Sequence, residues 1–390
     1  MTRDKFTSDK ISGLVRFPSK WHHVLSLKLK QFGSETGPAN KLLWSCLTQA
    51  YEFRKILFKK RLFSDPQLVS EWRLLQAQHR RTLTNNFKKL PEHKFYLSQS
   101  IFKNVGLNDF DRPIELFDLS KITTFEPGCI YLLNSNEVTK AGLQNYINTY
   151  LKSPKAIVAI WDFDNHHNLA PSFAMAAFCD LYIPCHEQNL GQMAHLNDSI
   201  AAPVSAAVIQ WSRPFLTDNL TKILTAPRHT QPLGRHLIYK GFWTRNSNVE
   251  KLSKWFNHVG PIGDHYHQLN HEDRLHEWTS HMAHWVLPTF NDVPIRIFDA
   301  LITGGIPLAP LSLRQHPSLS SFREHILFYD EADLADPWPI THAANERFLS
   351  QGTDGILQRH RLAMEQGHVD ARVAQMINLI QDHFDSTHRN

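Results

Sequence analysis

Short apolar runs alternate with helical stretches from about residue 113 to the end of the chain, and this pattern most constrains the fold. The runs are continuous, as a strand buried on both faces requires. Strands of this kind separated by helices form a parallel sheet covered on both sides, so the pattern predicts an α/β fold. The expected strands are IELFDL, CIYLLNS, KAIVAIWDF, DLYIPC, APVSAAVI, HLIYKGFW, HWVLPT, GIPLAP and HILFYD, and the expected helices include 137–152, 171–178 and several between 342 and 384.

The 390 residues exceed what one hydrophobic core usually supports, so we expect more than one domain. TAPRHTQPLGRH, near residues 225–236, has the proline and glycine content of a linker. The expected organisation is a basic helical region over residues 1–105 and Rossmann-like domains over 106–230 and 231–390. The two domains are expected to face each other across a cleft, with ligands at the carboxyl ends of the strands. A glycine-rich GxGxxG turn is absent.

The net charge is +5, and the first hundred residues carry many of the basic side chains, interleaved with aromatic and aliphatic ones. Such a region could contact an anionic membrane surface, or be an ordinary solvated helix face. No nucleic-acid-binding motif accompanies the charge, so no nucleic-acid partner is expected. The sequence has no apolar run long enough to span a bilayer and its start resembles no secretory signal. These features predict a cytoplasmic protein, peripheral at most to the inner face of the cell membrane.

The segment NDVPIRIFDALITGGIPLAP, residues 291–310, has the features of a phosphate-binding helix. A proline precedes the expected helix and two glycines follow it. Free amides at the helix start suit a phosphate, and Arg296 can add a charge-assisted hydrogen bond. Asp299 lies three residues later on the same face, where it could accept the hydroxyls of a ribose. The alternative is an Arg–Asp pair on the surface of a packed helix.

The same segment resembles the donor-binding signature P-x-R-x-F-E-A-x-x-x-G-G-x-P of GT-B glycosyltransferases of the spore-maturation and exostosin-like types. The matching positions are Pro294, Arg296, Phe298, Ala300, Gly304, Gly305 and Pro307. Asp299 stands where glutamate is commoner, and Asn291 stands where many retaining relatives carry a second glutamate. The resemblance extends over roughly residues 155–384. It leaves open whether the anomeric configuration is retained or inverted.

The resemblance implies two Rossmann-like domains and metal-independent sugar transfer with no cofactor beyond the nucleotide-sugar substrate. It implies donor contacts from Gly241 and Arg245, which resemble the start of the family's donor domain, and from His265 in a loop that often meets the base. Gly304 and Gly305 belong to the donor side as well. The acceptor would be a glycan or glycolipid, in the assembly of a bacterial surface polysaccharide.

Polar clusters after two expected strands are candidates for the acceptor side. WDFDNHHN, residues 161–168, places Asp162, Asp164 and His166 where a general base could deprotonate an acceptor hydroxyl, with His167 as a further contact. CHEQN, residues 185–189, adds His186 and Glu187 after the next strand. Helix capping is the competing explanation for both clusters.

The histidine-rich run over residues 264–284 does not predict a zinc site. HEWTSH spaces its histidines five apart, whereas a metalloprotease helix needs four to place both on one face. RQHPSLSS, residues 314–321, has a weak similarity to motifs of transferases that use cytidine-monophosphate sugars, which keeps such a donor as an alternative. A non-catalytic protein that binds nucleotides or sugars on the same fold is the second alternative, and a hydrolase that uses the histidine-rich run is the third.

Overall fold

The computed structural model describes residues 93–153, 155–239, 241–262, 269–290 and 292–386, all within the compact unit Pro66–Asn390. Most of the predicted basic helical region therefore lies outside the described residues. Its predicted end at residue 105 needs correction, because β1 (Phe95–Ser98) is already a strand of the first sheet. Its four residues, FYLS, are too few to show a strand period against the helical pattern before them.

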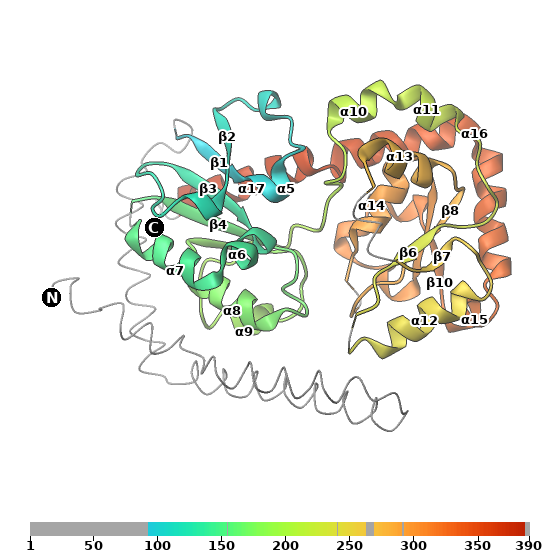
Figure 1. Ribbon diagram of the computed structural model, residues 1–390, viewed down its shortest axis with the longest axis horizontal. Helices are drawn as coiled ribbons and strands as arrows, with labels where there is room; N and C mark the ends of the chain where they lie inside the picture. The colour runs from blue at the N-terminus through green and yellow to red at the C-terminus, as the bar shows by residue number, and fades with distance from the viewer. Residues whose placement is uncertain (1–92, 154, 240, 263–268, 291, 387–390) are drawn as a thin grey trace. The chain divides into compact units, whose positions relative to one another are not determined.

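A five-stranded parallel sheet forms the first half of the described chain, as the continuous apolar runs predict (Figure 1). Its strand order is β2-β1-β3-β4-β5, and every neighbouring pair is parallel. The strands after β1 are β2 (Ile114–Phe117), β3 (Ile130–Asn134), β4 (Ile157–Asp162) and β5 (Leu181–Pro184). β3, β4 and β5 are buried along their whole lengths.

Alternate residues of this sheet enter two separate hydrophobic cores. Tyr131 and Val158 pack on one face with residues of α6 (Ser135–Ala141), α7 (Leu143–Lys152) and α8 (Leu169–Ala177). Leu132 and Ala159 pack on the other face with α17 (Val369–Ser386) (Figure 1). The same face includes the short helix α5 (Gln99–Phe102), while α9 (Leu190–Met193) and the 3-10 helices η3 (Leu107–Asp109) and η4 (Leu119–Lys121) complete this half.

Two local predictions in this half are wrong. The helix predicted over 137–152 is two helices, because Gly142 adopts a positive φ of 93° between them. The strand predicted at 202–209 joins no sheet: residues 204–208 are buried, and Val208 makes a parallel bridge to His368. Burial alone produced the apolar pattern there, and the pattern does not report hydrogen-bond partners.

The second half is also α/β, with shorter strands. β8 (Ala283–Trp285), β9 (Ile306–Pro310) and β10 (Leu327–Tyr329) form one parallel sheet, and β6 (Gly234–His236) pairs in parallel with β7 (Val259–Pro261). Leu233 bridges to His284, and the Trp285 N–H donates to the Leu233 carbonyl at 2.7 Å, which links the two sets of strands. The 3-10 helices η6 (Leu311–Leu313), η7 (Pro317–Leu319) and η8 (Arg323–His325) lie between β9 and β10.

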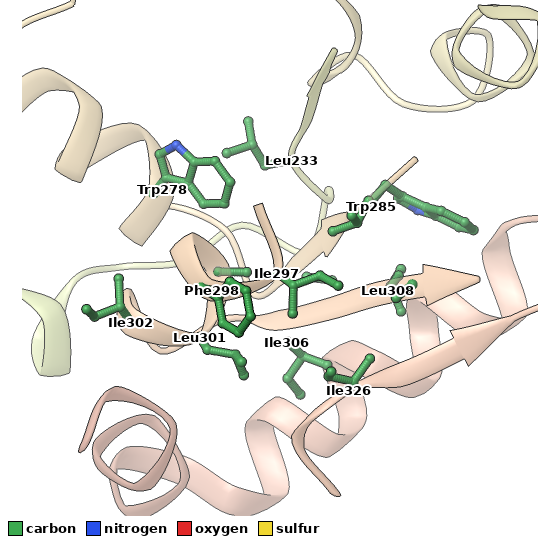
Figure 2. Close-up of a cluster of buried hydrophobic side chains, with 14 of the residues drawn as sticks. Leu233, Trp278, Trp285, Ile297, Phe298, Leu301, Ile302, Ile306, Leu308 and Ile326 are labelled. Atoms are coloured by element: carbon green, nitrogen blue, oxygen red, sulfur yellow. The ribbon is translucent and has the colours of Figure 1, made fainter. Parts of the chain in front are cut away.

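The core of this half surrounds α14 (Ile295–Ile302) and β9, as Figure 2 shows. Ile297, Phe298 and Leu301 of α14 are fully buried against Ile306 and Leu308 of β9. Full burial of such a side chain stabilises a fold by about 1.5–3 kcal/mol, so α14 is a central structural helix. The other helices are α10 (Arg213–Asp218), α11 (Leu220–Thr225), α12 (Trp243–Ser253), α13 (His271–Thr279), α15 (Glu331–Ala335) and α16 (Trp338–Gln366).

The structure differs from the predicted boundaries of the two α/β domains in both directions along the chain. Leu216 of α10 and Ile223 of α11 belong to the second core, although both precede the predicted linker at 225–236. Conversely, α17 lies in the range predicted for the second domain, but its Val373 and Ile380 pack in the first core. Among the described residues, no helix has both the length and the apolar character that a membrane span requires.

Candidate functional site

Asp162 ends β4 and is fully buried. Its carboxylate accepts a hydrogen bond from the Tyr182 hydroxyl at 2.5 Å and one from the Asp164 backbone N–H at 3.0 Å. These bonds fix the start of the loop that follows the strand. The structure therefore places Asp162 in a supporting position, away from solvent, where the sequence suggested a base.

The loop after β4 exposes a carboxylate and an imidazole together. Asp164 and His167 have side chains that are 33% and 31% exposed, and the Asp164 Oδ1 lies 3.8 Å from the His167 Nε2. Burial raises the pKa of Asp164 above its ordinary value; Asp162 adds to this effect and His167 opposes it. The side chain of Asp164 does not cap α8, whose N-cap residue is Asn168. These two groups are the reachable proton acceptors of the loop.

His166 lies behind this pair and is 8% exposed. Its Nε2 is 2.9 Å from the His167 Nδ1 and 3.8 Å from the Oδ2 of Asp292. Burial, with contributions from His186 and His167, lowers the pKa of His166 to about 2. The imidazole is therefore neutral at pH 7, which makes it a poorer base than an ordinary histidine.

His186 follows β5 and packs against His166, with ring centroids 4.1 Å apart. Asn165 holds its backbone: the Asn165 amide donates to the His186 carbonyl at 2.7 Å and accepts from the His186 N–H at 2.9 Å. The His186 Nε2 donates to the Phe163 carbonyl at 3.1 Å. Burial lowers the pKa of His186 to about 4, so this ring too is neutral at pH 7. The structure thus brings together the two polar clusters predicted after β4 and β5.

Glu187, the other acceptor-side candidate, is exposed, and its charge acts on His316. His316 in turn acts on His186, so the RQHPSLSS segment approaches this cluster. The His316 Nδ1 accepts from the Ser318 N–H at 3.2 Å and caps η7. Nothing in the sequence showed that this weak motif lies near the loops after β4 and β5, because it comes from a distant connection of the second half.

Asp292 is the main residue that sequence reasoning missed. It lies just before α14 and joins this segment to the loop after β4 through the 3.8 Å approach to His166. Its Oδ1 accepts a hydrogen bond from the Thr289 N–H. Burial raises the pKa of Asp292 to about 7, although Thr289, Arg245 and Arg296 oppose the rise. The only sequence feature that could have indicated Asp292 was its position next to Asn291, a residue outside the described part of the chain.

Two guanidinium groups stand beside Asp292. Arg245, in the first turn of α12, donates from Nε to the Leu287 carbonyl at 3.0 Å and from a terminal nitrogen to the Leu237 carbonyl at 2.5 Å. Arg296, in the first turn of α14, donates from Nε to the Arg235 carbonyl at 2.8 Å. Burial lowers the pKa of Arg245, and the neighbouring charge of Arg296 lowers it further. The structure thus brings together the two arginines that the sequence assigned to the donor.

Asp299 does not lie where a ribose could reach it. Its side chain is fully buried in α14, its Oδ2 accepts from the Gln210 amide at 2.5 Å, and its Oδ1 has no partner among the described residues. Burial raises the pKa of Asp299 to about 7. Asp299 lies three residues after Arg296 on α14, but Arg296 is only half-buried, whereas Asp299 points into the core.

The three candidate glycines have different structural roles. Gly304 has a φ of 80° and a Cβ there would lie 2.3 Å from Ile356, while a Cβ at Gly305 would lie 2.3 Å from the His284 ring. These two glycines allow α14 and β9 to pack against their neighbours. Gly241 has a φ of 91° with open space around it, so it suits a loop that approaches a ligand. His265, the remaining donor candidate, lies outside the described residues.

Aromatic side chains, two of them exposed, lie beside His167 of this cluster. Phe290 is 62% exposed, adopts a positive φ of 51°, and packs against Phe242 with ring centroids 4.7 Å apart. Phe242 also contacts Tyr239 and His167 edge to face. A ring of exposed aromatics beside polar groups is suited to the apolar face of a sugar or to a base. The sequence did not predict this patch, because its members come from separate loops.

A group of described residues has the composition of a metal site. His166, His186 and Asp292 each offer one ligand atom, and the three atoms lie within 4.8 Å of one another. The histidine-rich run, by contrast, places His281 with His229 and His258, whose rings contact one another, and His281 bonds the Gln231 carbonyl. Part of that run, residues 263–268, lies outside the described residues.

Comparisons with known proteins add little to this geometry. No model of a known protein family matches the sequence, and no curated protein matches it. Among solved structures, the fold is similar to a chain of the structure titled "Crystal structure of GtfA/B complex", with a TM-score of 0.38 and 11% sequence identity over 67% of this chain. The match spans 58% of that chain. A similarity this weak does not show a shared function.

Proposed function

We propose that this protein is a glycosyltransferase that moves a sugar from a nucleotide-sugar donor to a glycan or lipid-linked acceptor. The observation that carries the proposal is the pair of guanidinium groups of Arg245 and Arg296 beside the start of α14, near a carboxyl group whose pKa is raised to about 7. The charge of Arg296 lowers the pKa of Arg245, and a pair of neighbouring positive charges favours an anionic ligand. The signature around Arg296 suggests that this anion is a nucleoside diphosphate.

The first turn of α14 adds to the attraction for phosphate. Pro294 is the N-cap residue and has no side-chain cap, so it leaves the N–H groups of Ile295 and Arg296 to a ligand, while the Ile297 N–H donates to the Pro294 carbonyl at 3.1 Å. Backbone carbonyls hold the Nε atoms of both arginines, which orients the terminal nitrogens before a ligand binds. Negative charge develops on the diphosphate as the glycosidic bond breaks, and these donors stabilise it there.

The acceptor side of the proposed reaction is the exposed Asp164–His167 pair. In an inverting transfer the acceptor oxygen attacks the anomeric carbon, the nucleotide leaves with the bonding electrons, and the acceptor proton passes to a base. Asp164 is our candidate for that base, because burial raises its pKa towards the range in which a carboxylate accepts protons effectively. His167 would orient it and contact the acceptor, and the exposed aromatic ring of Phe290, packed on Phe242, would contact a sugar face.

Binding of nucleoside diphosphates tests the donor site directly. Isothermal titration of the protein with uridine, guanosine, thymidine and cytidine diphosphates, and with cytidine monophosphate, should identify one preferred ligand. Arg296→Ala should weaken its binding roughly 10- to 100-fold, because a hydrogen bond to a charged group is lost. The nucleotide affinity of Arg296→Lys should lie between those of the wild type and Arg296→Ala, since lysine keeps the charge without the planar fork.

Arg361→Ala is the matched control, since Arg361 is exposed on α16. It should bind the ligand as the wild type does. Equal loss of affinity in Arg361→Ala and Arg296→Ala would show a nonspecific charge effect and would contradict the assignment of the donor site. Preference for cytidine monophosphate would support the alternative donor class instead.

A further inference from the structure

His166, His186 and Asp292 come from three connections of the chain: the loop after β4, the chain after β5 and the loop before α14. Their ligand atoms lie within 4.8 Å of one another, and the His166 Nε2 is 3.8 Å from the Asp292 Oδ2. In a tetrahedral site with bonds near 2.0–2.1 Å, ligand atoms are about 3.4 Å apart. The His166–Asp292 pair, at 3.8 Å, is already close to that separation, and no pair need close by more than about 1.4 Å.

The imidazole of His186 is prepared for a ligand. Only 3% of the residue is exposed, and its Nδ1 is buried without a hydrogen-bond partner among the described residues. Its Nε2 donates to the Phe163 carbonyl, which assigns the proton to Nε2 and leaves the Nδ1 lone pair free. Metal-bound histidines usually show this arrangement, with the second ring nitrogen held by a carbonyl or carboxylate. A buried polar atom without a partner is otherwise unfavourable.

At His166 the nitrogen measured against Asp292 is Nε2, which also lies 2.9 Å from the His167 Nδ1, so a metal bound through Nε2 would replace that contact. The Nδ1 of His166 is also buried without a partner among the described residues, while its Nε2 contacts His167. The Thr289 N–H holds one carboxylate oxygen of Asp292 and leaves the other directed at His166. Both imidazoles thus carry an unpartnered nitrogen, and the carboxylate is fixed from its far side. Three separate features of one cluster point to the same kind of ligand.

We propose that His166, His186 and Asp292 bind a divalent transition-metal cation of the zinc class. Two imidazoles and one carboxylate match the preferences of Zn²⁺ and its neighbours, whereas Mg²⁺ and Ca²⁺ prefer oxygen ligands alone. The metal would join the loop before α14 to the two connections that follow the paired strands β4 and β5. It would therefore stabilise the folded state by mass action. This inference does not depend on sugar transfer, and no step of the proposed reaction passes through the metal.

Metal titration of the full-length protein tests the proposal. Protein treated with a chelator and then freed of it should bind Zn²⁺ at one equivalent, with a rise in Tm that increases with zinc concentration. Co²⁺ should give visible absorption bands of a site with nitrogen and oxygen ligands. His186→Ala and Asp292→Asn should weaken Zn²⁺ binding by at least about 100-fold, since even a lost outer contact costs 10- to 100-fold.

His258→Ala is the matched control, because His258 belongs to the separate cluster with His229 and His281. It should keep the zinc-dependent rise in Tm. Near-ultraviolet circular dichroism establishes that each variant is folded; Asp292→Asn, which keeps the side-chain shape, serves if His186→Ala unfolds. The proposal is overturned if wild type shows no zinc-dependent shift, if Asp292→Asn retains it in full, or if His258→Ala abolishes it. Arg296→Ala should bind nucleotide more weakly yet bind zinc as the wild type does. Failure of the metal proposal can therefore be told apart from failure of the proposed function.

Discussion

At the scale of single residues, Asp299 carries an ionisable group inside the core. Its carboxyl accepts one hydrogen bond, from Gln210, and its second oxygen has no partner among the described residues. Burial disfavours the charged form more than Arg296 and Arg274 favour it, so the pKa rises from 3.8 to about 7. The folded protein therefore holds a proton on Asp299 over a range of pH in which the unfolded chain has lost it.

Asp299→Asn should change how stability depends on pH. Because the folded pKa is raised, the stability that the protonated carboxyl allows is complete below about pH 4 and is lost as the pH rises towards 7. Between pH 5 and pH 8 the wild type should lose about 1–3 kcal/mol of unfolding free energy relative to the asparagine variant. Urea denaturation of both proteins at the two pH values measures the difference. Parallel pH profiles would contradict the buried, protonated state.

Sequence reasoning found individual site residues unevenly. Arg296 was predicted from its place near a helix start and Arg245 from the resemblance to a donor domain, and the structure brings them together. Asp292 and Phe290 were missed, because their significance comes from His166 and Phe242, which are distant in sequence. Asp299 was expected to face a ribose, but the structure buries it, with its carboxylate bonded to Gln210 of another segment.

At the scale of elements, Gly304 of the signature segment is needed to end α14. The Gly305 N–H donates to the Ala300 carbonyl at 2.8 Å and the Gly304 N–H to the Leu301 carbonyl at 2.9 Å. This is the Schellman arrangement, which requires a left-handed residue at the position of Gly304. The glycine pair thus ends the helix and starts β9 within a few residues.

Gly304→Ala should destabilise the fold by about 2–4 kcal/mol, because it combines backbone strain with a close contact. Its φ is 80° and the new Cβ would lie 2.3 Å from Ile356. Gly241→Ala is the control: its φ is 91° but no atom lies within 4 Å of the new Cβ, so only about 1–2 kcal/mol of strain is expected. Thermal and urea denaturation compare the two. Equal losses would show that packing against α16 is unimportant.

Most strands of the first sheet could be predicted, because burial on both faces leaves a continuous apolar run. The run at 202–209 is equally apolar but forms no strand, since burial without a neighbouring ladder gives the same pattern. The helix predicted over 137–152 broke at Gly142, whose positive φ is set by the turn it makes. The spacing of apolar residues along the chain therefore predicts which segments are buried, but it does not predict which strands pair through hydrogen bonds.

At the scale of the whole described chain, the helix α17 was predicted to belong to the second domain but packs in the core of the first. Asp370 at its start bonds Arg213 at 2.7 Å and accepts from the Gly106 N–H at 2.9 Å, and the Val208 N–H donates to the Gly367 carbonyl at 2.8 Å. An amphipathic helix fits either core by its pattern alone, so the sequence could not assign it. The mixed α/β class was predicted correctly, and the arrangement of two domains across a cleft stays a prediction.

The central claim is that the arginine pair serves sugar transfer, and turnover tests it most directly. Release of nucleotide from a panel of nucleotide-sugars, with and without glycan or lipid-linked acceptors, should identify one donor that the wild type consumes. Arg296→Ala should lower kcat/KM for that donor at least about 100-fold, because an interaction with the departing phosphate is lost. Asp164→Asn should lower kcat with little change in nucleotide affinity. If no nucleotide-sugar in the panel is consumed, or if Arg296→Ala turns the donor over at the wild-type rate, the account is contradicted.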